Sequence, residues 1–150
     1  MGAAPEVGRK APDFILPTTA GPFTLTEAIK KGKVVLAFYS EDNTPTCTTQ
    51  LSSFVDEHAT LRELGAEVLG VSVDSLSTHE RFVENLGKVP FPLASDEDGT
   101  VARLYDVVDE SGKRSRRAIF IVDRDGTLIY KNPHYTPGNP GHYMEIFQAL

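Results

Sequence analysis

The sequence has little cysteine, no tryptophan and no long apolar run among its 150 residues. Its single cysteine, Cys47, excludes the framework of internal disulfides that supports many small secreted domains. The opening "MGAAPEVGRK" lacks the apolar core of a signal peptide, and no apolar run reaches the roughly 18 residues needed to span a membrane. We therefore expect a cytoplasmic protein that neither crosses nor enters a membrane.

Basic charge is also scarce, because 15 lysines and arginines face 21 aspartates and glutamates, a formal net charge of −6. A general nucleic-acid binder normally carries a basic field, so this class is not expected. One basic cluster, "KRSRR" (113–117), departs from the average. Its Lys113, Arg114 and Arg116 are interpreted as part of a solvated loop, with a phosphate-binding patch as the alternative. Arg117 differs, because it begins a predicted strand.

The rest of the composition is typical of a globular protein, with 40% apolar and 24% charged residues. A chain of this length fits one domain, residues 1–150, and is long enough to bury a core. Three short apolar runs rich in valine or isoleucine predict strands that are buried on both faces. These runs are "KVVLAFYS" (33–40), "AEVLGVSVD" (66–74) and "RAIFIVD" (117–123).

Helical patterns alternate with these strands. A 3.6-residue apolar period predicts one helix from Thr44 to a stop at Gly65. Further helices are predicted over 75–87, with Ser77 or Thr78 near the cap, and over 99–108. A short strand over 91–95, a hairpin turn over 123–128 and a final short helix complete the pattern. This order of strands and helices is typical of an α/β fold.

Metal and cofactor sites are not indicated. The turn "DRDGTL" (123–128) carries Asp123 and Asp125, but it lacks the later oxygen ligands and the closing glutamate of a calcium loop. One cysteine and four dispersed histidines offer no ligand spacing typical of zinc. We expect neither a metal nor a cofactor.

The cysteine has an unusual local setting. If Thr44 is the N-cap and Pro45 the first helical residue, Cys47 falls in the first turn, among unpaired backbone N–H groups and the positive end of the helix dipole. Leu51 and Phe54 follow at helical spacing, which places the thiol on the core face. This position predicts a pocket at the C-terminal edge of the sheet, where ligands usually bind in α/β folds. The simpler interpretation is a small buried hydrophobic side chain.

A reactive thiol at this position requires a cation. A free thiol has a pKa near 8.5, and a dominant thiolate at neutral pH needs a preference of about 3–4 kcal/mol for the anion. A helix N-terminus supplies about 0.3–1 kcal/mol, and up to about 2 when partly buried. Arg117 would supply the remainder if strand 117–123 lay antiparallel beside strand 33–40. A parallel strand would carry it to the opposite rim, and the residues alone leave both arrangements open.

The segment "FYSEDNTPTCTTQ" (38–50) resembles the active-site segment of peroxiredoxins, most closely the bacterioferritin-comigratory (PrxQ-type) branch with its motif Pro-x-x-x-Thr-x-x-Cys. The segments "GAEVLGVSVD", "FPLASDEDGTVARLYDV" and "RRAIFIVDRDGTLIY" also resemble this family, in the same order, so that the resemblance covers roughly residues 8–132. It implies a thioredoxin-like α/β fold, a central mixed sheet flanked by helices, in which an antiparallel strand carries Arg117 to the thiol.

The resemblance also implies an activity, the reduction of hydrogen peroxide or organic hydroperoxides. Cys47 would be the peroxidatic cysteine, and Thr44 and Arg117 would stabilise the charge on the departing oxygen. Thr44 would serve both as helix cap and as donor. Gln50 matches a position that often helps to hold the arginine in relatives.

Two positions depart from the family pattern. Ser40 replaces the motif proline, which alters the wall of the pocket that shields the thiolate. Ser52 replaces the second cysteine that many relatives carry, so no intramolecular disulfide can form. An external thiol must therefore reduce the oxidised cysteine, and thioredoxin, glutaredoxin or a low-molecular-weight thiol are the candidates. We expect a monomer or a homodimer.

Other functions remain open at this point. The main alternative keeps the fold without the activity, as a thioredoxin-like module for binding or redox sensing, and Ser40 is its best support. A cysteine hydrolase needs a histidine base, which the spacing of the four histidines does not suggest. A thiol–disulfide oxidoreductase in its usual form is excluded because the sequence has no Cys-x-x-Cys.

Overall fold

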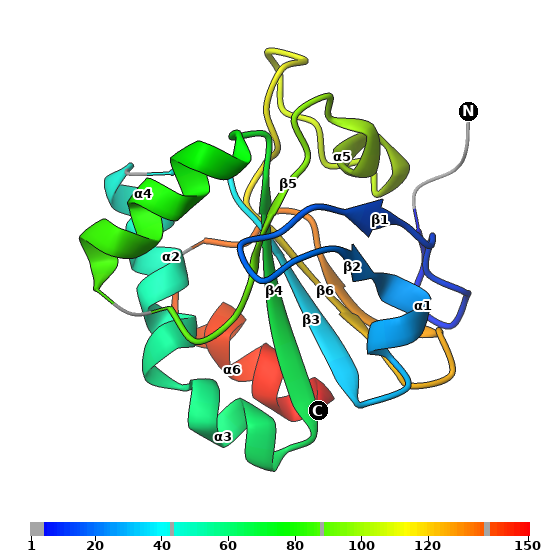
Figure 1. Cartoon of the computed structure of the whole chain (residues 1–150). Coiled ribbons are helices and arrows are strands. Elements are labelled where there is room, and N and C mark those ends of the chain that lie inside the picture. The colour runs from blue at the N-terminus through cyan, green and yellow to red at the C-terminus, as the bar shows by residue number, and fades with distance from the viewer. Residues whose placement is uncertain (1–4, 43, 88, 137–138) are drawn as a thin grey trace.

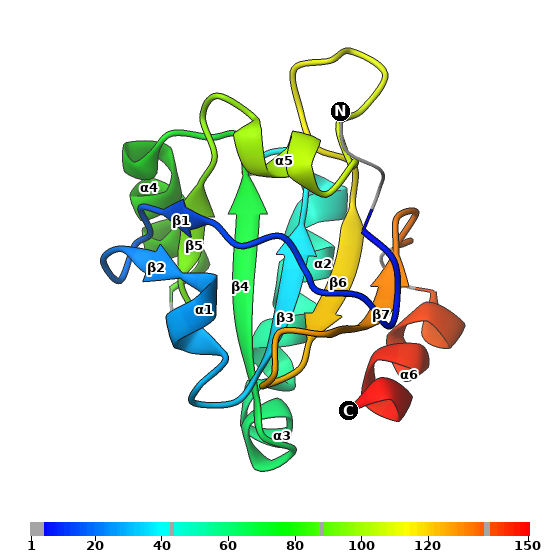
Figure 2. The same cartoon turned by 90° about the vertical axis from the view of Figure 1, so that its right-hand side faces the viewer.

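The computed structural model describes residues 5–42, 44–87, 89–136 and 139–150. A five-stranded sheet forms its centre, in the order β5-β4-β3-β6-β7 (Figures 1 and 2). Strands β3 (Lys33–Phe38), β4 (Ala66–Ser72) and β5 (Leu93–Ser95) are parallel to one another. Strands β6 (Ala118–Val122) and β7 (Leu128–Asn132) extend the sheet in antiparallel fashion, so the sheet is mixed.

The strands form where the apolar runs predict them. Every residue of β6, and β3 from Val34 to Phe38, is buried, which confirms strands covered on both faces. The strand ends differ slightly from the predicted ranges. The predicted strand over 91–95 begins only at Leu93, after Pro92, whose nitrogen has no hydrogen to donate to a ladder.

The first predicted helix is two helices. Helix α2 (Pro45–Asp56) ends at Glu57, where φ is −103° and ψ is 10°, and α3 (His58–Glu63) follows directly. The prediction of one continuous helix is therefore wrong, because a local backbone turn that no glycine or proline marks interrupts it. Gly65 follows the end of α3 and has a φ of 82°, so the helical segment stops where the sequence predicts.

The remaining helices follow the predictions with corrected ends. Helix α4 (Leu76–Leu86) is capped by Ser75, which accepts a hydrogen bond from the Thr78 amide, so the cap lies before Ser77 and Thr78. Helix α5 (Thr100–Leu104) is shorter than expected, and Asp106 with a φ of 56° leaves the helical conformation soon after its end. The final helix is α6 (Pro140–Ala149).

Two small strands and one short helix precede the central sheet. Strands β1 (Ile15–Leu16) and β2 (Phe23–Thr24) form a separate antiparallel pair, and α1 (Leu25–Ala28) follows β2 directly. The hairpin between β6 and β7 is confirmed, since the Gly126 amide donates to the Asp123 carbonyl and Gly126 has a φ of 89°.

The sheet separates two hydrophobic cores. One face packs against α1, α5 and the β1–β2 pair, and the other face packs against α2, α3, α4 and α6 (Figures 1 and 2). Cys47 belongs to the second core, together with Tyr39 and Leu51. Among the described residues, no helix has the length and apolar character needed to cross a membrane.

Strand β6 runs antiparallel to β3, and Phe38 is paired with Ala118. This pairing confirms the arrangement on which the role of Arg117 depends. Arg117 directly precedes Ala118, so it lies beside the C-terminal end of β3, at the edge of the sheet from which the chain continues toward Cys47.

Candidate active site

Cys47 lies in the first turn of α2, as the sequence predicts. Thr44 is the N-cap with extended backbone angles, and Pro45 stands at the helix start. The Cys47 side chain has no exposed surface, and Leu51 and Phe54 are buried in the same core. The thiol therefore points to the core face at the start of a helix, where the helix dipole favours negative charge.

The Thr44 side chain does not cap the helix. Its hydroxyl donates to the Glu41 carbonyl at 3.1 Å instead, and no side-chain cap bond is formed. The expected capping role is therefore corrected, because the hydroxyl turns back across the loop that precedes α2. The backbone still starts the helix, since the Thr48 amide donates to the Thr44 carbonyl at 2.8 Å.

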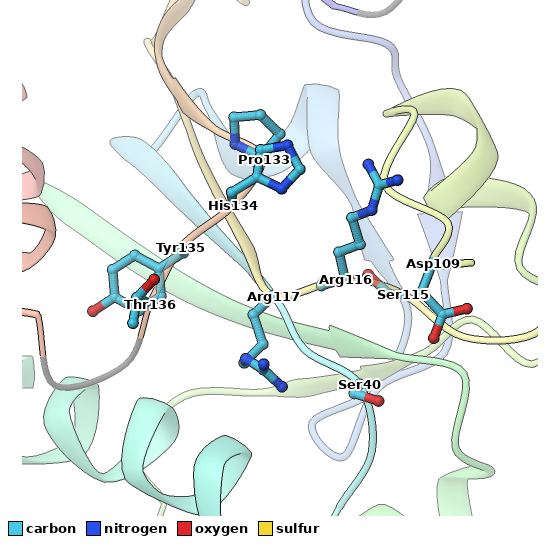
Figure 3. Close-up of a pocket in the computed structure, with 9 residues that line it drawn as sticks. All are labelled: Ser40, Asp109, Ser115, Arg116, Arg117, Pro133, His134, Tyr135 and Thr136. Carbon is cyan, nitrogen blue, oxygen red and sulfur yellow. Dashed lines mark hydrogen bonds between the residues drawn. The ribbon is translucent and has the colours of Figure 1, made fainter. Parts of the chain in front are cut away.

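Arg117 is half-buried at the same edge of the sheet. Its guanidinium extends toward Ser40, whereas Arg116 extends to the other side of the strand (Figure 3). Within the described part of the chain, the Arg117 guanidinium forms no ion pair and no hydrogen bond, including with the Cys47 sulfur. The structure thus brings Cys47, Thr44 and Arg117 to one edge of the sheet without joining arginine and thiol directly.

A pocket of about 340 Å³ opens beside this edge. It is formed by the end of β3, the segment before β6 and the segment after β7 (Figure 3). Cys47 is not part of the lining. The lining residues are Ser40, Asp109, Ser115, Arg116, Arg117, Pro133, His134, Tyr135 and Thr136. The serine that replaces the family proline therefore lies in the same pocket wall as Arg117.

Gln50 ties α2 to the end of β3. It is fully buried, and its Nε2 donates to the Phe38 carbonyl at 3.1 Å. Its Oε1 is buried and has no hydrogen-bond partner in the described structure, and no hydrogen bond joins it to Arg117. Gln50 thus presents an unused acceptor close to the end of β3, where the neighbouring strand β6 begins just after Arg117.

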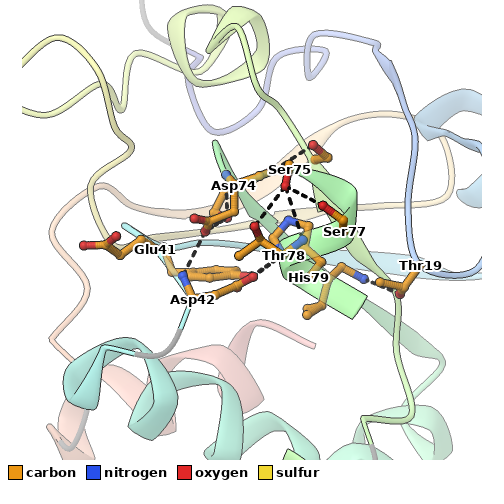
Figure 4. A network of polar contacts seen from close by, with 12 residues as sticks. Thr19, Glu41, Asp42, Asp74, Ser75, Ser77, Thr78 and His79 are labelled. Carbon is orange, nitrogen blue, oxygen red and sulfur yellow. Dashed lines mark hydrogen bonds and ion pairs between the residues drawn. The ribbon is translucent and has the colours of Figure 1, made fainter. Parts of the chain in front are cut away.

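A buried polar network, absent from the predicted site, holds the loop between β3 and α2 (Figure 4). The Tyr39 hydroxyl donates to Asp42 Oδ1 at 2.6 Å, and His79 Nδ1 lies 2.7 Å from Asp42 Oδ2. The Asp42 amide donates to Asp74 Oδ2 at 2.8 Å, and Ser72 donates to the same oxygen. Periodicity could not reveal this network, because its members come from the loop after β3, the end of β4 and α4.

The ring of His79 and the hydroxyl of Tyr39 are both fixed by hydrogen bonds. His79 Nε2 lies 2.9 Å from the Ala94 carbonyl and Nδ1 lies 2.7 Å from Asp42, so both ring nitrogens are engaged. Burial, followed by the negative charge of Asp42, raises the pKa of Tyr39 well above its usual value, so the phenol remains a donor. None of the hydrogen bonds of His79 reaches Cys47, so His79 is not placed as a base for the thiol.

The same cluster contains possible metal ligands. Ligand atoms of Asp42, Asp74 and His79 lie within 4.8 Å of one another. Each of these groups already takes part in the hydrogen bonds described above, and the His79 ring has both nitrogens engaged. The geometry therefore fits a hydrogen-bond network that fixes the loop before Cys47.

Comparisons with known proteins agree with these features. Residues 7–131 match the AhpC/TSA family. The protein named Peroxiredoxin 2 of Thermoplasma acidophilum is 38% identical over 96% of this chain and 75% of its own length. A candidate peroxiredoxin of Coxiella burnetii, bcp, is 40% identical over 97% of this chain and 98% of its own length. The crystal structure of the peroxidoxin BcpB of Mycobacterium tuberculosis superposes with a TM-score of 0.84 at 28% identity, covering 97% of this chain and 96% of that one.

Proposed function

Because this chain belongs to the AhpC/TSA family of peroxiredoxins, which are thiol peroxidases, we propose that it reduces hydroperoxides through Cys47 alone. Its α/β fold is thioredoxin-like, as the resemblance implies. Within the family we place it in the PrxQ-type branch, in a form without a second cysteine. The observation that carries this proposal is a sole cysteine in the first turn of α2, at the edge of the sheet to which β6 brings an arginine.

The first half of the reaction oxidises the thiolate. The Cys47 sulfur attacks the terminal oxygen of the hydroperoxide, an S–O bond forms, and the O–O bond breaks. The electron pair of the O–O bond leaves with the other oxygen, the one attached to the organic group or to the second hydrogen, which takes up a proton and departs as an alcohol or water. Cys47 becomes a sulfenic acid, and the peroxide is reduced by two electrons.

Thr44 and Arg117 are the proposed donors to the departing oxygen. Negative charge grows on this oxygen as the O–O bond stretches, and fixed donors at that point lower the barrier. Arg117 is suited to this role because no carboxylate of the described chain neutralises it. A sulfur with no exposed surface meets a peroxide only if side chains around it move apart, so access to Cys47 requires a local opening at the start of α2.

The second half of the reaction needs an external thiol. Residue 52 in α2 is a serine, and Cys47 is the only cysteine in the sequence. The sulfenic acid therefore has no internal partner with which to form a disulfide. The one-cysteine mechanism follows, with thioredoxin, glutaredoxin or a small thiol as the reductant.

Cys47→Ser tests the proposal. We expect consumption of hydrogen peroxide in the presence of dithiothreitol to fall to the rate of the reagent alone, because serine cannot form a sulfenic acid. A sulfenate-trapping reagent should label the wild-type protein and leave the variant unlabelled. Ser52→Ala is the matched control, and it should retain the wild-type rate.

One result would favour the alternative of a binding or redox-sensing module. In that case wild-type protein would react with hydrogen peroxide no faster than a small-molecule thiol does at the same pH. Alkylation of Cys47 would then become appreciable only above about pH 8, as for an unactivated thiol.

A further inference from the structure

Two neighbouring arginines line the pocket without a counter-ion. Arg116 and Arg117 are both half-buried, and in the described part of the chain neither guanidinium forms an ion pair or a hydrogen bond. Arg114, in the same segment, does pair with a carboxylate, since it lies 3.4 Å from Glu41. The sequence predicts a solvated loop for Arg116, but the structure places it in the wall of a pocket.

The one acidic residue of the lining does not neutralise this charge. Asp109 Oδ1 accepts hydrogen bonds from the amide and the hydroxyl of Ser111, within its own turn. His134 lines the pocket on the side of Arg116 and adds further donor capacity (Figure 3). The protein has a net charge of −6, so its acidic side chains outnumber its basic ones, yet this concave surface is left cationic. An arginine in such a setting is suited to bind a carboxylate, because its planar guanidinium can donate two parallel hydrogen bonds to the two oxygens.

We propose that this pocket, the Arg116 pocket, binds the carboxylate of a small anionic thiol that reduces oxidised Cys47. The inference rests on the proposed function, because only an oxidised Cys47 without a partner cysteine needs an external thiol. The volume of about 340 Å³ suits a small molecule. Most of the lining side chains are polar or charged, which suits a hydrophilic thiol better than the apolar tail of a fatty-acid hydroperoxide.

The reduction proceeds in two balanced steps. The thiolate of the small molecule attacks the sulfur of the sulfenic acid, an S–S bond forms, and the S–O bond breaks. The oxygen leaves as hydroxide and takes up a proton to give water. A second molecule of the thiol attacks the small-molecule sulfur of this mixed disulfide, which releases Cys47 and a disulfide of the reductant. Arg116 holds the carboxylate while these exchanges occur.

The main experiment compares reductants of different charge. Reduced protein is oxidised with one equivalent of hydrogen peroxide, and the rate of sulfenate reduction is followed by stopped flow. Glutathione carries two carboxylates, whereas 2-mercaptoethanol carries none. Arg116→Gln should lower the ratio of the glutathione rate to the 2-mercaptoethanol rate about tenfold, the loss expected for a charge-assisted hydrogen bond. Arg116→Lys keeps the positive charge, so this variant should recover part of the wild-type ratio.

Lys113→Gln is the matched control. Lys113 is exposed in the same segment and lies outside the Arg116 pocket, so its loss removes one charge and should leave the ratio unchanged. Raising the salt concentration from about 0.02 to about 0.5 M should slow reduction of the wild-type protein by glutathione more than by 2-mercaptoethanol, because salt screens exposed charges.

A second measurement does not depend on catalysis. S-methylglutathione has the same carboxylates but cannot react, and calorimetric titration should show binding to the wild-type protein that Arg116→Gln weakens about tenfold, again by loss of a charge-assisted bond. If this binding is found but no sulfenate ever forms, the proposed function is wrong, whereas the binding of a carboxylate in the Arg116 pocket is still supported.

Three results would overturn the inference. The first is that S-methylglutathione binds the wild-type protein and Arg116→Gln equally, or binds neither. Arg116→Gln could slow both reductants alike, which indicates a general disturbance of the site. Finally, the variant could leave the reductant ratio unchanged and slow a fatty-acid hydroperoxide more than hydrogen peroxide, which would assign the pocket to the carboxylate of the peroxide.

Discussion

Arg117 reaches the edge of the sheet near Cys47 because β6 runs antiparallel to β3 and starts beside its end. At the residue scale, two cationic side chains that are neighbours in the sequence extend in different directions from this segment (Figure 3). Arg117 extends toward Ser40 and the start of α2, and Arg116 extends into the other part of the pocket. Under the two proposals made above, Arg117 would act in the peroxide step and Arg116 would bind the reductant, on different sides of the segment.

Arg117→Ala should slow the reaction of reduced protein with hydrogen peroxide. We expect a loss of roughly 10²–10³ in rate constant, the range observed when one donor to a developing oxyanion is removed. Stopped-flow mixing under excess peroxide measures this constant directly. Arg117→Lys should recover part of the loss, because a lysine keeps the charge and lacks the planar fork of donors.

Lys113→Ala is the comparison for this experiment, since it removes an exposed cation of the same segment. Circular dichroism of each variant checks that the fold is retained. An Arg117→Ala protein that is folded and reacts with peroxide at the wild-type rate would show that Arg117 does not act in the oxidation step.

At the scale of elements, the start of α2 is held from outside its own sequence. The loop between β3 and α2 contains Asp42, which is bound by His79 of α4 and by Asp74 after β4. Tyr39 adds a third bond from the end of β3. The position of Cys47 therefore depends on packing between the loop, β4 and α4, and not only on the helix signal of Thr44-Pro45.

His79→Leu should destabilise the fold by about 3–5 kcal/mol, the usual cost of leaving a buried charge, here the Asp42 carboxylate, without one of its partners. The variant leaves the Asp42 carboxylate buried with one partner fewer. Urea denaturation monitored by circular dichroism measures the change in the free energy of unfolding. His134→Leu is the control, because His134 is exposed, and its effect should stay within about 0.5 kcal/mol.

A double-mutant cycle with Asp42→Asn makes this prediction more specific. Two groups that act on each other should show non-additive losses, so the double variant should lose less stability than the sum of the two single variants. Strict additivity, or a loss below about 1 kcal/mol for His79→Leu, would mean that the network contributes little to stability.

At the scale of the whole molecule, tyrosine hydroxyls join segments that are far apart in the sequence. The Tyr105 hydroxyl donates to the Pro12 carbonyl at 2.7 Å, and the Tyr143 hydroxyl donates to the Ser53 carbonyl at 3.0 Å. Burial raises the pKa of Tyr135 to about 12. Burial also raises the pKa of the other four tyrosines above the usual value: Tyr39, Tyr105, Tyr130 and Tyr143.

These shifts predict loss of stability in alkali. In the unfolded protein the tyrosines ionise with a pKa of about 10, whereas in the folded protein they keep their protons to higher pH. The contribution of these tyrosines to the free energy of unfolding is therefore fully present below about pH 10. It is lost as the pH rises toward the pKa values of the folded protein. A spectrophotometric titration should show little tyrosinate at pH 10 in the folded protein, and tyrosinate should appear together with loss of circular dichroism at higher pH.

The same titration in concentrated urea is the reference, and there about half of the tyrosines should be ionised near pH 10. Half-ionised tyrosines at this pH in a protein with unchanged circular dichroism would contradict the predicted burial of the hydroxyl groups.

Features that depend on neighbouring residues can be predicted from the amino-acid sequence. Valine-rich runs predict the buried strands, and Thr44-Pro45 places Cys47 in the first turn of α2, because backbone preference and apolar period act over a few residues. The tertiary structure alone decided which segments meet. It set β6 antiparallel to β3, broke the first helix at Glu57 and turned the Thr44 hydroxyl away from its cap position.

The tertiary structure also assembled two features whose members are far apart in the sequence, the network around Asp42 and the Arg116 pocket. Asp42 and His79 are 37 residues apart, and Arg116 and His134 come from segments on either side of the β6–β7 hairpin. Contacts of this kind depend on how strands pair and helices pack, which is a property of the whole chain and has no period or local spacing in the sequence.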